Sequence, residues 1–93
     1  MSIVRLVQIK TNPLNSETAE RILKDVASLM ISQKGCMSEK LLRVKGGEFI
    51  SYSEWETTED MEHFTSSAAY KQLVRRMRDE GAYANVKLCN PVN

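Results

Sequence analysis

The chain has 93 residues, of which 42% are hydrophobic and 27% charged, a composition typical of one ordinary globular domain. A formal net charge of +1 argues against a dedicated nucleic-acid binder, because such domains carry a clear excess of Lys and Arg. Cys36 and Cys89 are too few for the disulfide framework of a secreted domain and lack the spacing of a zinc site. With no signal peptide and no apolar run of about 18 residues, we expect a cytoplasmic protein.

Hydrophobic periodicity and turn residues divide the chain into strands and helices. The first strand is apolar on both faces, the first helix repeats apolar residues at helical spacing, and Gly46 and Gly47 suit a tight hairpin turn. Thr57, followed three residues later by Asp60, resembles a capping box. In chain order the predicted elements are a strand Ser2–Lys10, a helix Glu17–Gln33, strands Cys36–Lys45 and Glu48–Glu56, a short helix from Thr57, a helix capped by Ser66 or Ser67, and a strand Ala82–Leu88.

This order is the ferredoxin-like split βαβ pattern of an α+β fold. In that pattern a four-stranded antiparallel sheet has the first and third strands at its centre, and both helices lie on one face. The other face is left open, yet the first strand is apolar on both sides and the third carries aromatic residues on both. An exposed apolar face usually marks an interaction surface. We therefore expect a homodimer in which two copies pack sheet against sheet and enclose a cavity beside each open face.

The block SYSEWETTEDMEHFTSSAAYKQLVRRM, residues 51–77, resembles the antibiotic biosynthesis monooxygenase family of dimeric α+β barrels. In that family a strand ends in Trp and passes into an acidic helical segment. The resemblance extends more loosely over residues 1–93, as a single domain of this kind. It implies a binding chamber between sheet and helices.

The same resemblance implies an activity. Family members include oxygenases that oxidise phenolic or quinol substrates with dioxygen and use no flavin, haem or metal. In such enzymes an electron-rich phenol, once deprotonated and desolvated, passes electrons to oxygen itself. The protein supplies orientation, a base or hydrogen-bond donors, and exclusion of water. The expectation is therefore a cofactor-independent monooxygenase that acts on an aromatic, phenolic or quinol-like small molecule.

Trp55 and Tyr52 are the candidate catalytic residues. Trp55 occupies the position of the family's strand-terminal Trp, where it either presents its indole to a flat substrate or fills the core. Tyr52 matches an aromatic position of quinone-forming relatives and points to the opposite face of the strand. Those relatives often have Asn before this Tyr, whereas this chain has Ser51, whose hydroxyl lacks the separate donor and acceptor of an amide.

Ser51, Arg75, His63 and Phe64 are the candidate substrate-binding residues. His63 is either a solvated surface residue or a general base near a chamber mouth. Arg75 lies in a charged helix and is either solvated or turned inward to bind an anion. The haem-degrading branch of the family relies on an Asn in the first strand, a Trp in the short helix and an axial His in the long helix. At the two helix positions this chain has Phe64 and Val74, and its first strand has no Asn. No haem is therefore expected.

Two further arginines fall on predicted strands. Arg5 and Arg43 either project into the chamber or pair with Glu39 or Glu54, and an ion pair is the simpler expectation.

Besides a monooxygenase, two functions stay open: a non-catalytic module that binds a small hydrophobic ligand, and a structural dimeric domain whose chamber is filled by side chains.

Overall fold

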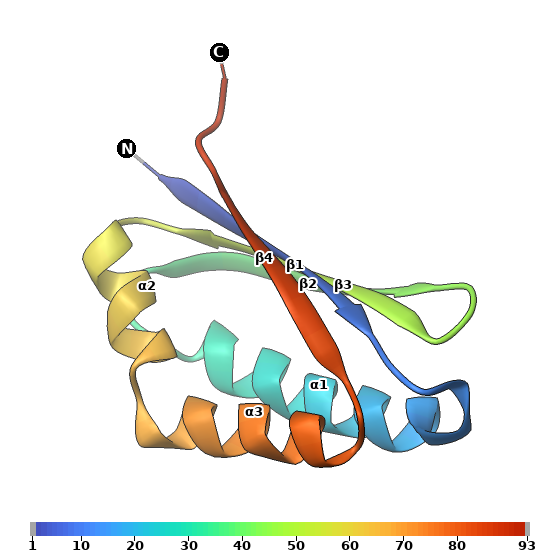
Figure 1. Cartoon of the computed structure of the whole chain (residues 1–93). Coiled ribbons are helices and arrows are strands. Elements are labelled where there is room, and N and C mark those ends of the chain that lie inside the picture. Colours follow the sequence, from blue (N-terminus) through green and yellow to red (C-terminus); the bar gives the residue numbers. More distant parts are fainter. Residues whose placement is uncertain (1, 93) are drawn as a thin grey trace.

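The computed structural model, which describes residues 2–92, is a four-stranded antiparallel sheet with its helices on one face (Figure 1). The predicted α+β ferredoxin-like fold and the predicted order of elements are confirmed. The elements are β1 (Ile3–Lys10), a 3-10 turn η1 (Pro13–Asn15), α1 (Ser16–Ile31), β2 (Cys36–Val44), β3 (Glu48–Trp55), α2 (Thr58–Thr65), α3 (Ala68–Asp79) and β4 (Tyr83–Cys89).

The strands follow the order β2-β3-β1-β4, so β1 and β3 are central as predicted. All neighbouring pairs are antiparallel. Gly46 and Gly47, with φ of +81° and +79°, form the turn between β2 and β3. Because few residues other than glycine adopt this backbone region, the pair explains why the hairpin forms here.

Side-chain caps fix where the two later helices begin. The Thr57 hydroxyl accepts a hydrogen bond from the backbone N–H of Asp60 at 3.1 Å, as predicted for α2. Ser67 does the same for α3 by accepting from the N–H of Tyr70. Asn15 precedes α1 without capping it, and its amide nitrogen donates a hydrogen bond to the carbonyl of Glu80. The turn after Trp55 therefore passes into α2 at a defined position.

Strand register divides the sheet into two faces. We call the helix-facing side the inner face; it carries Val7 and Ile9 of β1 and Phe49 and Trp55 of β3, all buried. The opposite side is the outer face. Its residues alternate with those of the inner face along each strand, as the pleat requires. The residues of its central strands include Val4, Leu6, Ile50 and Tyr52.

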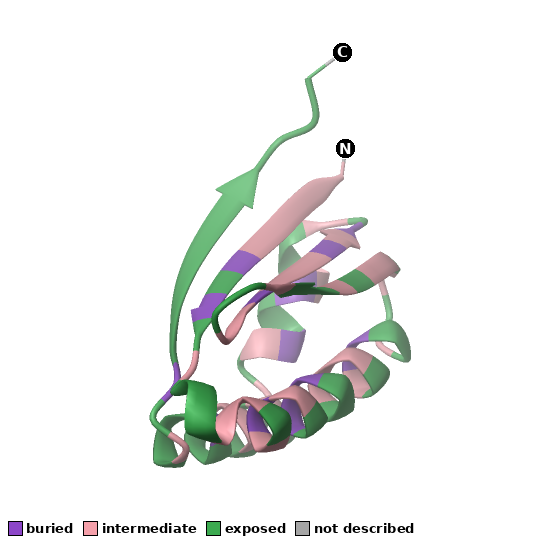
Figure 2. Cartoon of the chain, turned by 90° about the vertical axis from the view of Figure 1, so that its right-hand side faces the viewer, coloured by how far each residue is buried: buried purple, intermediate pink, exposed green. Residues whose placement is uncertain are grey.

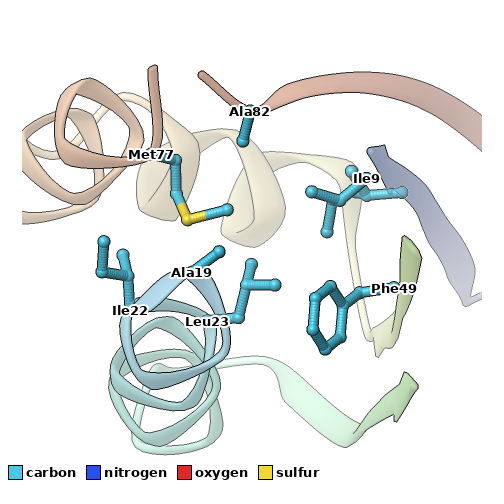
Figure 3. Packing of buried hydrophobic residues seen from close by; sticks show 8 residues of the cluster. Ile9, Ala19, Ile22, Leu23, Phe49, Met77 and Ala82 are labelled. Atoms are coloured by element: carbon cyan, nitrogen blue, oxygen red, sulfur yellow. The ribbon is translucent and has the colours of Figure 1, made fainter. Parts of the chain in front are cut away.

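Two clusters of buried side chains hold the helices against the inner face. The larger cluster joins β1 and β3 to α1 and α3 (Figure 3). It consists of Val7, Ile9, Ala19, Ile22, Leu23, Phe49, Met77 and Ala82. The smaller cluster consists of Met30, Trp55, Met61 and Phe64 and joins the end of β3 to α1 and α2. β4 contributes no buried side chain to either cluster, since every one of its residues is exposed (Figure 2).

An ion pair ties the β2 edge to α1. Arg43 donates two hydrogen bonds of 2.7 Å to the carboxylate of Glu20, and Lys24 lies 3.3 Å from the same group. The bonds from Arg43 hold the pKa of Glu20 at about 2, below its ordinary 4.5. The pair therefore favours the folded state at neutral pH, and this contribution is lost as the pH falls from 4.5 towards 2. An ion pair was predicted for Arg43, but its partner is a helix carboxylate rather than Glu39 or Glu54.

Gly35 lets α2 pack closely against the turn that follows α1. Its φ is +86°, and a Cβ at this position would collide with the side chain of Asp60. Gly46 has a similar φ of +81° with nothing within 4 Å of such a Cβ. We predict that Gly46→Ala lowers the free energy of unfolding by about 1 kcal/mol, the cost of the backbone conformation alone.

Gly35→Ala is expected to lower the free energy of unfolding by a further 1–3 kcal/mol or so, because overpacking adds to the same backbone cost. Urea denaturation of both variants measures the difference. Equal losses would show that the contact between Gly35 and Asp60 is not tight.

Candidate functional site

A pocket of about 390 Å³ lies between the inner face and the helices. β1 and β3 supply one wall and α1 and α3 the other, while the start of β4 borders the opening. The lining residues are Arg5, Val7, Ile9, Leu23, Val26, Ser51, Tyr70, Val74, Met77, Arg78, Ala82, Tyr83, Ala84 and Val86. Its size falls at the small end of the range of roughly 300–1,000 Å³ for ligand pockets. The pocket is thus on the helix side of the sheet, not beside the open outer face.

The helices do not cover β4, which lies at the edge of the pocket. Val86 and Leu88, which pair with Val7 and Arg5 of β1, are 46% and 54% exposed although they belong to the inner face. Figure 2 shows β4 exposed from end to end. The pocket therefore has exposed lining residues on β4, among them Tyr83 and Val86.

Arg5 and Tyr70 form a polar corner in this mostly apolar pocket. Arg5 Nη2 donates a hydrogen bond of 2.8 Å to the hydroxyl of Tyr70, and the guanidinium carbon lies 5.5 Å from the centre of the Tyr70 ring. Arg5 reaches Tyr70 because position 5 of β1 shares the inner face with Val7, while Tyr70 lies in the first turn of α3. The corner therefore links the sheet to α3 across the pocket.

Ser51 is the one predicted site residue that lines the pocket. It lies on β3 opposite Val7 of β1, with its hydroxyl on the inner face. No hydrogen bond to another described residue engages this hydroxyl, so it is free to donate to or accept from a ligand. Ser51 and Arg5 are diagonal neighbours on adjacent strands, a spacing of about 7–8 Å that a single ring system spans.

Trp55 does not line the pocket, but it packs against Phe64, which in turn packs against the lining residue Tyr70. Its side chain is fully buried, and its Nε1–H donates a hydrogen bond of 3.0 Å to Ser53 Oγ. The Trp55 ring stacks on Phe64 with 5.6 Å between ring centroids, and Phe64 packs on Tyr70 at 4.9 Å. We call Trp55, Phe64 and Tyr70 the aromatic stack. It runs from the end of β3 through α2 and places the Tyr70 hydroxyl beside Arg5.

The other predicted site residues lie elsewhere. Tyr52 pairs with Leu6 of β1 and Lys40 of β2 on the outer face, opposite to Ser51 and Ser53. His63 and Arg75 are exposed on α2 and α3 and do not line the pocket. Phe64 is buried inside the aromatic stack. Roles for these four side chains in binding or catalysis stay predictions, and the structure brings none of them into contact with this pocket.

A half-buried acid, Glu39, lies on the inner face of β2, outside the pocket. Glu39 sits opposite Ser53, and its Oε2 has no hydrogen-bond partner among the described residues. Burial raises the pKa of this carboxyl above its ordinary value. Burial, together with the charge of Glu39, also raises the pKa of the Cys36 thiol, which is therefore a poor nucleophile. Neither Glu39 nor Cys36 lines the pocket.

Sequence patterns identified Arg5 as an unusual strand residue but missed Tyr70 as a site residue. Tyr70 fits the apolar stripe of its helix, so only its hydroxyl sets it apart from Leu73 and Val74. Arg5 lines the pocket, which is the first of its two predicted alternatives, and the second, an ion pair with Glu39 or Glu54, is not formed in the described part of the chain. Glu54 lies on the outer face, where it accepts a hydrogen bond from Ser2, and the only described partner of the Arg5 side chain is Tyr70.

Residues 2–92 contain neither a metal-binding cluster nor a membrane-spanning helix. In this part of the chain no three His, Cys, Asp or Glu side chains come together as metal ligands. None of its helices combines the length and apolar character that crossing a membrane demands.

The chain matches one known protein family. The family model described as antibiotic biosynthesis monooxygenase matches residues 2–76, which include β1, the hairpin, the aromatic stack and most of α3. The chain belongs to this family. A search among curated protein sequences finds no match.

Solved structures agree with this family assignment at the level of the fold. A mutant of SnoaB, a cofactor-independent oxygenase from Streptomyces nogalater, superimposes with a TM-score of 0.89 at 12% identity over 99% of this chain and 94% of that one. A Deinococcus radiodurans protein provisionally named an antibiotic biosynthesis monooxygenase gives 0.91 at 10% identity over 98% and 93%. A conserved Bacteroides thetaiotaomicron protein of unknown function gives 0.87 at 18% over 95% of both chains. At these identities the likeness to each structure shows a shared fold.

In this family member, Trp55 is expected to act through packing. Trp55→Phe removes the hydrogen bond to Ser53 and leaves a small void beside Phe64. We predict a loss of about 2 kcal/mol in the free energy of unfolding, measured by chemical denaturation. Tyr52→Phe, a change on the outer face, should alter it by no more than about 0.5 kcal/mol. Equal losses in the two variants would contradict the structural role of Trp55.

Proposed function

We propose that this protein is a small cofactor-independent monooxygenase that binds an aromatic, phenolic or quinol-like molecule in the pocket between sheet and helices. The observation that carries the proposal is the mostly apolar pocket with a polar corner formed by Arg5 and Tyr70, in a chain of the antibiotic biosynthesis monooxygenase family. The fold it shares with SnoaB, a cofactor-independent oxygenase, supports the same activity. Two free thiols, Cys36 and Cys89, fit a cytoplasmic location.

The proposed reaction needs only the substrate and dioxygen. A phenol with hydrogen at the para carbon becomes the para-quinone: the ring gives four electrons to O₂, one oxygen atom becomes the new carbonyl, and the other leaves as water. Apolar walls built from Val7, Leu23 and Val26 exclude water, which favours electron transfer from a desolvated ring. Ser51 and the Tyr70 hydroxyl hold the substrate oxygens, and Arg5 stabilises negative charge as it develops.

A non-catalytic binding module is the second candidate. The open pocket supports it equally, because binding requires the same apolar walls and polar corner. Such a module would show a saturable rise in melting temperature with a ligand but form no product. A purely structural role has less support, since side chains leave about 390 Å³ of this space unfilled.

Oxygen consumption tests the proposed activity. We expect the protein to consume O₂ with at least one member of a panel of naphthoquinols and acylated phenols, monitored with an oxygen electrode and by product absorbance. Ser51→Ala and Tyr70→Phe should each lower kcat/KM about tenfold or more, because each removes a hydroxyl that contacts the substrate. Ser28→Ala, a matched change at an exposed position of α1, should leave the rate unchanged.

Equal rates of O₂ consumption in the wild-type protein and in all these variants would show that the pocket takes no part in the reaction. Binding without uptake across the whole panel would favour the non-catalytic module.

The proposal includes a homodimer formed through the outer faces of two sheets. Its support is the apolar outer face, where Leu42 is 49% exposed beside Ile50. We expect light scattering at micromolar concentration to give twice the chain mass. Ile50→Glu should give the single-chain mass, because a charge in an apolar interface is costly to bury.

Leu14→Glu, at a leucine that is 91% exposed in η1, is the matched control and should remain dimeric. A wild-type protein that is folded and monomeric would refute this part of the proposal.

A further inference from the structure

The pocket carries positive charge that its described lining residues do not neutralise. Arg5 and Arg78 both line the pocket, whereas no Asp, Glu or His is among its described lining residues. The ion pairs found in residues 2–92 do not involve Arg5. A guanidinium among apolar walls is costly without a counter-charge. The pocket therefore favours a ligand that brings a negative charge of its own.

The hydrogen-bonding capacity of the corner is only partly used. A guanidinium has five N–H donors, and the one described hydrogen bond of the Arg5 side chain goes to Tyr70. Because the Tyr70 oxygen accepts this bond, its own proton remains available for a ligand. Arg5 and Tyr70 thus offer several donors at one point of the pocket. A carboxylate or phenolate, which only accepts, is the matching group.

The described pocket lining offers no carboxylate or imidazole that could ionise a ligand after it enters. Removal of a proton inside the pocket requires a base within hydrogen-bond distance, and neither a carboxylate nor an imidazole is among the lining residues. His63 is exposed on α2 and Glu39 lies on β2, both outside the lining. A simple phenol is neutral at pH 7, because its pKa is close to the value of about 10 for Tyr.

We infer that the pocket selects small aromatic molecules with an acidic group ionised at neutral pH, and that Arg5 is the residue that recognises it. Suitable groups are a ring carboxylate or a phenol acidified by a neighbouring carbonyl. The inference rests on the proposed use of this pocket for an aromatic molecule. Arg5 is the specificity determinant, and Tyr70, which it contacts, gives the second hydrogen bond to the same oxygen.

A matched pair of probes tests the charge directly. 2-Naphthoate and 2-naphthamide share a ring system and a planar substituent but differ in charge. Isothermal titration calorimetry at pH 7 should show that the wild-type protein binds the naphthoate about 10–100-fold more tightly, the range expected for a hydrogen bond to a charged group. A preference of less than about twofold, or no binding of either probe, would overturn the inference.

Two substitutions assign the preference to a residue. Arg5→Gln should abolish the preference for naphthoate while the affinity for naphthamide changes little. Arg21→Gln, which removes an equal charge from an exposed position of α1, should retain the preference. If Arg5 only fastened β1 to α3, its loss would weaken both probes equally. Equal weakening, or a preference that survives in Arg5→Gln, would overturn the inference.

A measurement on the wild-type protein covers the case in which Arg5→Gln does not fold. The Nε–H resonance of Arg5 should shift in NMR spectra during titration with naphthoate and stay in place with naphthamide. Binding of naphthoate without this shift would overturn the inference.

The two proposals fail in different ways. Charge-selective binding without oxygen uptake would refute the oxygenase proposal alone. Uptake with neutral quinols, lost in Ser51→Ala but unaffected by Arg5→Gln, would refute the anion inference and the role of Arg5 in the reaction, while the oxygenase proposal would stand.

Discussion

The contact between Arg5 and Tyr70 joins the two layers of this protein at the point where its pocket lies. Arg5 belongs to the central strand β1 and Tyr70 to the first turn of α3, and their hydrogen bond crosses from sheet to helix. Tyr70 is held there by the aromatic stack, which ends at Trp55 in the smaller core cluster. The geometry of the pocket therefore depends on packing that begins well outside it.

The sheet uses its two faces for different purposes. On the inner face, α1 and α3 cover Val7, Ile9 and Phe49 but leave β4 exposed, and the pocket is the space that results. The outer face has no helix and keeps apolar side chains such as Leu42 exposed. An apolar surface of this kind is stabilised when another surface covers it. In the proposed dimer, association uses one face and ligand binding the other, so the interface need not contribute side chains to the site.

Much of the fold was predictable because its signals are local. The glycine pair of the hairpin, the Thr57 cap and the apolar spacing of α1 each act over a few residues, and each appears where it was expected. The site was less predictable. β1 is apolar on both faces, so its pattern does not say which face meets the helices. The bond between Arg5 and Tyr70 joins residues 65 positions apart and depends on the docking of α3, which no local pattern records.

The crystal structure of the protein soaked with an aromatic quinol tests the central claim, that ligands bind on the helix side of the sheet. The account predicts that the ring lies between β1 and α3, with one oxygen within hydrogen-bond distance of the Tyr70 hydroxyl. The ring should also contact Val7 and Leu23. Density for the ring on the outer face, near Ile50 and Tyr52, would contradict it. In that case Tyr52, not Tyr70, would be the tyrosine that meets the substrate.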